Sequence, residues 1–161
     1  MPTPKQEIRT PDAPPPGGGY SQGIRRGNIV YTAGLGPQDP VTRQVVGETI
    51  QEQTRQTLRN LAAVLAAAGA TFGDVVKVTV HLQDLQRDFP GYDRVYREVM
   101  PEPRPARTTR RARARRARLQ RPSRSCAACR ERARFVMRGS IYRCARGSSI
   151  GCSSRCCMRS A

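Results

Sequence analysis

The composition of this chain changes abruptly after Thr109, so its two parts need separate interpretations. Residues 110–161 contain 16 of the 29 basic residues, one acid (Glu131) and all six cysteines, whereas residues 1–109 contain 13 basic and 11 acidic residues. The net charge is therefore +15 in the second part and +2 in the first, out of +17 in total. Only the first part has the patterning of a folded core, and it predicts one mixed α+β domain.

Length and composition predict three regions: a flexible N-terminal arm over residues 1–12, a domain over 13–109, and a tail over 110–161. Pro- and Gly-rich sequence continues to Gly19, so we expect a mobile linker up to that point. No run of 18 apolar residues exists, and no apolar segment follows Lys5, so neither a membrane span nor a secretory signal is expected. The absence of cysteine from the domain fits a cytoplasmic protein.

Apolar residues at helical spacing predict a helix over residues 50–68, because Thr49 and Glu52 form a capping-box pattern at its start. A second helix is predicted over 89–100, where Pro101 and Pro103 end it. Strands are predicted at 20–25, 28–35, 41–46, 74–85 and 106–109. The last of these is cut off almost as it starts.

The domain has few of the usual catalytic side chains. It contains no cysteine, and its single histidine, His81, lies in the middle of a strand, where a hydrogen-bonded surface role is the simplest interpretation. Gly34-Leu35-Gly36 lacks the third glycine and following helix of a nucleotide-binding loop. Arg107, at the start of a strand after Pro105, is well placed to bind a carboxylate through its planar fork.

Several short motifs, none specific alone, occur together in a fixed order. They are Gly19-Tyr20-Ser21-Gln22-Gly23, Ile29-Val30-Tyr31-Thr32-Ala33-Gly34-Leu35-Gly36-Pro37, Gln53-Thr54 with Leu58-Arg59-Asn60-Leu61, Ala67-Ala68-Gly69, Asp74-Val75-Val76-Lys77-Val78-Thr79-Val80-His81-Leu82-Gln83-Asp84-Leu85, and Pro105-Ala106-Arg107. In order and spacing, residues 13–109 resemble the RidA/YjgF/UK114 family of reactive-intermediate deaminases.

The resemblance implies a chorismate-mutase-like α+β fold: an antiparallel-rich mixed sheet with two helices on one face. It also implies a homotrimer with ligand sites in clefts between subunits. The implied activity is the hydrolysis of imine or enamine acids, such as 2-aminoacrylate, to a 2-keto acid and ammonia, without a cofactor or metal. This chain would be such an imine or enamine deaminase at the level of the family.

The same resemblance implies the site residues. Arg107 would bind the substrate carboxylate, and Tyr20 would line the site and offer its hydroxyl; these are the predicted catalytic residues. Gly34 would offer a backbone carbonyl to the substrate nitrogen, Thr109 a backbone N–H near the carboxylate, and Asp93 stands where many members carry an asparagine. Without this resemblance, Tyr20 is an aromatic residue packed at an interface and Gly34 a bulge or close-approach glycine.

Two departures from the family pattern matter. An anion at Asp93 would weaken carboxylate binding by like-charge repulsion. After Thr109 nothing matches the family's C-terminal strands or the glutamate that activates water, and Glu131 does not lie in strand-like sequence. Because Arg, Ala, Ser, Cys and Gly make up 41 of the 52 tail residues, we hypothesise that 110–161 are disordered, or that they are read in a shifted frame or come from a sequencing error. Such a chain would lack two strands and fold poorly.

Three alternatives remain open at this stage. Without the glutamate, the protein is a binding module for small carboxylates rather than an enzyme. Taken at face value, the basic tail would bind nucleic acid, in a salt-dependent way, through residues 110–118. The Cys126–Cys129 spacing suggests a zinc site, but the later cysteines are irregularly spaced and no histidine accompanies them.

Overall fold

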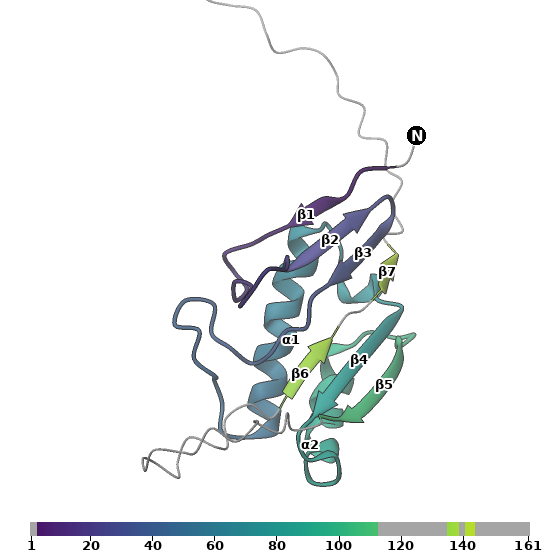
Figure 1. Cartoon of the computed structure of the whole chain (residues 1–161). Coiled ribbons are helices and arrows are strands. Elements are labelled where there is room, and N and C mark those ends of the chain that lie inside the picture. The colour runs from purple at the N-terminus through teal and green to yellow at the C-terminus, as the bar shows by residue number, and fades with distance from the viewer. Residues whose placement is uncertain (1–2, 113–134, 139–140, 144–161) are drawn as a thin grey trace, which may run out of the picture.

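The computed structural model describes residues 3–112, 135–138 and 141–143, and within them two α-helices lie on one side of two small sheets (Figure 1). The elements, in chain order, are β1 Gln6–Ile8, β2 Gly23–Arg26, β3 Ile29–Thr32, α1 Ile50–Ala67, the short 3-10 helix Phe72–Asp74, β4 Lys77–Leu82, α2 Leu85–Val99, β5 Ala106–Arg111, β6 Phe135–Arg138 and β7 Ile141–Arg143. The α+β class expected from the sequence is confirmed.

In the described part of the chain, the strands form one sheet of order β1-β2-β3-β7 and another of order β5-β4-β6. All neighbouring strands run antiparallel except β4 and β5, which are parallel because α2 forms the crossover between them. Val78 pairs with Arg107 across this parallel ladder, so these two side chains lie on the same face of the sheet. This register places Arg107 on the side of the sheet that α2 covers.

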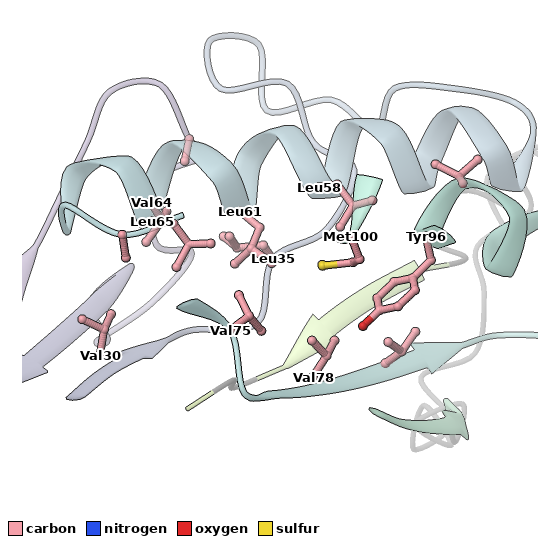
Figure 2. Packing of buried hydrophobic residues seen from close by; sticks show 14 of the residues in the cluster. Val30, Leu35, Leu58, Leu61, Val64, Leu65, Val75, Val78, Tyr96 and Met100 are labelled. Carbon is pink, nitrogen blue, oxygen red and sulfur yellow. The ribbon is translucent and has the colours of Figure 1, made fainter. Parts of the chain in front are cut away.

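Helix α1 begins and packs as its sequence predicts. The Thr49 side chain accepts a hydrogen bond from the Glu52 N–H, and the Glu52 carboxylate accepts one from the Thr49 N–H, which completes the capping box. The predicted apolar stripe of α1 is buried throughout: Ile50, Thr54, Thr57, Leu58, Leu61, Val64, Leu65 and Ala68. Figure 2 shows Leu58, Leu61 and Val64 along the helix above Val30 and Val78 of the sheets, so a single core holds both sheets.

Helix α2 begins four residues earlier than predicted. Asp84 caps it by accepting the Arg87 N–H at 3.2 Å, and Pro90 lies in the interior of the helix rather than at its first turn. The predicted start at residue 89 was wrong because Asp84 and Leu85 were assigned to the preceding strand, so the cap at Asp84 was missed. Gly91 is where α2 approaches α1, since a Cβ built there would lie 2.6 Å from Ile50 Cγ2.

The segment after β3 is a loop rather than the predicted strand at 41–46. Only one bridge, Gln38 to Val45, joins its two sides among the described residues. The Asp39 carboxylate instead accepts the N–H groups of Val41 and Thr42 at 3.0 and 2.7 Å, which favours a turn over a strand. Arg43 then adopts a positive φ of 61° before the bridge closes.

The N-terminal arm is part of the domain rather than a mobile linker. β1 pairs with β2, and Ile8 and Ala13 are buried. The buried Gln22 side chain binds the arm: its amide nitrogen donates to the carbonyls of Thr10, Ala13 and Pro14, and its oxygen accepts the Thr10 N–H at 2.7 Å. The expectation of a flexible arm is therefore wrong for residues 6–14.

The expectation that strand structure stops at Thr109 is also wrong. β5 continues to Arg111, where it pairs with Leu82. Two short strands from the tail, β6 and β7, pair with β4 and β3 respectively. Both sheets therefore gain a strand from the part of the chain that we expected to contribute none. Two sites were predicted in the tail. The basic segment 110–118 lies outside the described residues apart from 110–112, and the pair Cys126–Cys129 lies wholly outside them.

Candidate functional site

Arg107 contacts three aromatic rings and one carboxylate in the described structure. It projects from β5 toward α2, where its guanidinium carbon lies 5.5, 5.3 and 4.7 Å from the ring centres of Phe89, Tyr92 and Tyr96. A cation at these distances from a ring face is attracted by the ring's quadrupole. The three rings occur three and four residues apart on α2, so one face of the helix forms an aromatic surface for the arginine.

Asp93, one helical turn from Phe89, forms an ion pair with Arg107. The Asp93 Oδ1 lies 2.7 Å from Arg107 Nη1, and its Oδ2 lies 2.7 Å from Nε of Arg97, four residues further along α2. The side chain of Asp93 is 12% exposed and that of Arg107 is 23% exposed. One carboxylate is thus shared by two guanidinium groups, and the three side chains together carry a net positive charge.

The environment sets the charge states of this cluster. Burial raises the pKa of the Asp93 carboxyl, but hydrogen bonds and charge from Arg107 and Arg97 outweigh burial, so the pKa lies below its ordinary value. Burial acts to lower the pKa of Arg107, and its bond to Asp93 raises it overall. Burial raises the pKa of the Tyr92 hydroxyl, which lies 3.4 Å from Arg107 Nη1. At neutral pH the cluster is therefore Asp⁻ with two Arg⁺ and a neutral tyrosine.

In the described part of the chain, part of the Arg107 fork is left available to a ligand. The described contacts of its guanidinium with Asp93 and Tyr92 both use Nη1, and among the described residues neither Nε nor Nη2 has a hydrogen-bond partner. The side chain opens into a hollow of about 390 Å³ that Arg97, Arg104 and Tyr96 also line. This arrangement suits an anion, such as a carboxylate, that approaches from the open side.

Tyr20 and Gly34 lie in a different hollow, of about 240 Å³. Tyr20 is 54% exposed, and its hydroxyl accepts the Gly17 N–H at 3.0 Å, which leaves its own O–H free to donate. Buried Asn60 of α1 shapes this hollow by donating to the carbonyls of Gly36 and Gln38 at 2.9 and 2.7 Å. Residues 14–17, in and next to the arm that Gln22 binds, also line this hollow.

The predicted site residues are therefore divided between two places in one chain. Arg107 and Asp93 lie together, Tyr20 and Gly34 lie together, and no described hollow contains members of both pairs. Thr109 is half-buried in β5 and lines neither hollow, nor does His81 on β4. Sequence reasoning missed the aromatic surface beneath Arg107, although Phe89, Tyr92 and Tyr96 are spaced as neighbours on a helix face.

Comparison with known proteins identifies the fold and the family. A model of the family described as Endoribonuclease L-PSP matches residues 10–131. The chain belongs to this family. The match includes Tyr20, Gly34, Asp93 and Arg107, so the membership expected from the RidA-like motifs is confirmed.

Individual relatives of this L-PSP family member agree. A RutC family protein of Pyrococcus horikoshii is 48% identical over 103 residues, which are 64% of this chain and 81% of that protein. A 2-iminobutanoate/2-iminopropanoate deaminase of Dermatophagoides farinae is 39% identical over 107 residues, covering 66% of this chain and 83% of the relative. The crystal structure of Escherichia coli TdcF with bound serine superposes with a TM-score of 0.69 at 29% identity, covering 86% of this chain and 98% of TdcF.

Within the described residues, neither helix of this family member is both long and apolar enough to cross a membrane. The same residues bring together no group of three side chains suited to a metal ion. The cysteines considered for zinc lie outside the described part of the chain.

Asp93→Asn is expected to make the free energy of unfolding fall less steeply as the pH is lowered below neutral. The pKa of Asp93 is lower in the folded chain than its value of about 3.9 in an unfolded one, so its ion pairs stabilise the fold above that pH and less as the pH falls through the folded-state pKa. An asparagine does not titrate, so the variant should lose less stability on acidification. Urea midpoints at about pH 7 and about pH 3 measure the difference.

Glu7→Gln is the matched control, because Glu7 is exposed in β1 and forms no ion pair with another described residue. Its acid dependence should match that of the parent chain. An equal acid dependence in the parent and in Asp93→Asn would show that the Asp93 ion pairs do not stabilise the fold.

Proposed function

We propose that this protein hydrolyses imine or enamine acids, such as 2-aminoacrylate, to a 2-keto acid and ammonia. The observation that carries the proposal is Arg107, whose guanidinium is held against an aromatic surface with part of its fork open to a hollow. The similarity to a 2-iminobutanoate/2-iminopropanoate deaminase supports the reaction class, and the serine bound to TdcF supports a small amino or imino acid as ligand.

The chemistry requires little from the protein beyond orientation and proton transfer. The imine carbon is already electrophilic, so water adds across C=N, a proton moves to nitrogen, and the C–N bond breaks to release ammonia and leave the keto group. In this proposal Arg107 binds the substrate carboxylate, with the Thr109 N–H nearby. The Gly34 carbonyl accepts a hydrogen bond from the substrate nitrogen, and the Tyr20 hydroxyl orients the substrate.

A complete site would require the two hollows to face each other. Since Tyr20 and Arg107 lie in separate hollows of one chain, we propose that they meet across an interface between copies of the chain in a homotrimer. Two further expectations accompany the proposal. The protein acts in the cytoplasm, and the tail is read in a shifted frame, as its composition suggests. Sequencing the gene across codons 105–115 tests the second.

The test of function measures ammonia and keto-acid release. Imines of alanine and 2-aminobutyrate, generated in place by an amino-acid oxidase, are followed with and without the protein. We expect release to be faster than spontaneous hydrolysis and proportional to protein concentration. A rate equal to the spontaneous one, from protein that melts cooperatively, would refute catalysis.

One observation favours a second function, the binding of small carboxylates without turnover. The acid beside Arg107 is Asp93, whose two ion pairs and lowered pKa make it a weak general base at neutral pH. Under this alternative, 2-oxobutanoate should bind in calorimetry while imine hydrolysis stays at the spontaneous rate. Binding together with accelerated hydrolysis would favour the enzyme.

A further inference from the structure

The second hollow contains a charged residue that neither the sequence motifs nor the family comparison assigns. Arg43 lines it together with Tyr20 and Gly34. Among the described residues that line this hollow none is acidic, so Arg43 gives this lining a positive charge. Within the described part of the chain, the guanidinium of Arg43 forms no ion pair or hydrogen bond. A positively charged concave surface with a hydroxyl donor is suited to an anion.

Asp39, an acid of the same loop, already has hydrogen-bond partners. The Asp39 carboxylate accepts the N–H groups of Val41 and Thr42, and these bonds lower the pKa of Asp39, so it stays ionised without pairing with Arg43. The backbone N–H of Arg43 donates to the Asp39 carbonyl at 2.9 Å, which closes the turn. The loop thus fixes the backbone of Arg43 and leaves its charge unneutralised.

The backbone of Arg43 is held in an unfavourable conformation. Its φ of 61° lies in the left-handed region, where glycine and asparagine are usual and a long side chain is disfavoured. Among the described residues, it is the one residue other than glycine with a positive φ. Strain of this kind at the rim of a hollow suggests that the side chain has a role there.

We propose that Arg43 binds a second carboxylate of the substrate, so that the preferred substrates are imines of dicarboxylic amino acids. The inference rests on the proposed function: Arg107 holds the carboxylate next to the imine carbon, and the hollow of Tyr20 and Gly34 receives the remainder of the molecule. Uncharged side chains of the same length make no ionic contact with Arg43. The charge of the hollow thus selects for a second anionic group.

The experiment compares 2-oxoglutarate with 2-oxopentanoate as binding probes, and the imines of glutamate and norvaline as substrates, so that each pair has the same chain length and differs in the second carboxylate. Because Arg43 is exposed, we expect the dicarboxylate to be favoured by about fivefold in Kd and in kcat/KM. Three variants separate charge from backbone strain. Arg43→Ala and Arg43→Gly should both reduce the preference to about one, and Arg43→Lys should retain part of it.

Stability measurements on the same variants provide the structural control. Glycine relieves the positive φ, so Arg43→Gly should raise the Tm, whereas Arg43→Ala keeps the strain and should not. If Arg43→Ala retains the preference for dicarboxylates, or the parent chain shows none, the inference is wrong. Binding of 2-oxoglutarate with the expected preference but no turnover would instead refute the proposed reaction and leave the role of Arg43 intact.

Discussion

Replacing Arg107 with methionine is expected to lower kcat/KM for imine acids by about 100-fold or more, mainly through KM. A carboxylate bound by two charge-assisted hydrogen bonds loses roughly 3 kcal/mol when they are removed, which corresponds to about that factor. Arg107→Lys should lose less, because lysine keeps the charge but not the planar fork. Steady-state hydrolysis of the imine of 2-aminobutyrate measures both variants.

Stability must be separated from binding in this experiment, because Arg107→Met also leaves the carboxylate of Asp93 without one of its partners. Asp93 keeps its ion pair with Arg97, but a largely buried carboxylate that loses one of its two partners destabilises the fold. The double variant Arg107→Met with Asp93→Asn removes that charge and should recover much of the stability without recovering activity. Arg110→Met, on an exposed position of the same strand, is the control and should leave KM unchanged. Full activity of folded Arg107→Met would exclude Arg107 as the anchor.

Gln22→Ala is expected to lower the free energy of unfolding by about 3 kcal/mol. The Gln22 side chain is buried and bonds to four backbone groups of the arm, and each buried group left without a partner costs about 1–3 kcal/mol. Water that enters the space left by the Gln22 side chain forms hydrogen bonds with some of these backbone groups. The expected loss is therefore smaller than the summed cost of four groups without partners. Urea unfolding measures the loss.

Limited trypsin digestion adds a local readout, because Lys5 and Arg9 lie in the arm that Gln22 binds. Cleavage at these sites should be faster in Gln22→Ala than in the parent chain, under conditions where the rest of the domain stays intact. Gln83→Ala, at an exposed glutamine, is the matched control and should change neither measurement. If the arm of Gln22→Ala is as resistant to trypsin as the arm of the parent chain, then the pairing and burial of β1, rather than Gln22, keep the arm in place.

The sequence predicted best those elements whose local signals and packing agree. The cap and buried face of α1 follow from Thr49, Glu52 and an apolar repeat, all of which act within one or two turns. It failed at the start of α2. The predicted strand was extended through Asp84 and Leu85, whereas the Asp84 side chain accepts the Arg87 N–H and caps the helix.

The contacts among the predicted site residues could not be predicted from the sequence. Arg107 and Asp93 were both identified from the family resemblance, but their 2.7 Å ion pair depends on the register between β5 and α2, which no local pattern encodes. The arm was misinterpreted for a similar reason. Pro14, Pro15 and Pro16 suggest a linker, whereas the side chain that fixes the arm, Gln22, follows in the next motif. Composition gave no sign of this contact.

The way β6 and β7 pair has a consequence for the order in which the chain folds. β4, α2 and β5 follow one another along the chain, as do β1, β2 and β3, so both groups form through contacts between near neighbours. β7 instead pairs with β3, joining Arg143 to Ile29, and β6 returns to β4. Closing such long loops is slow relative to local pairing. During synthesis, β3 and β4 therefore each keep one edge without a paired strand until β6 and β7 have been synthesised.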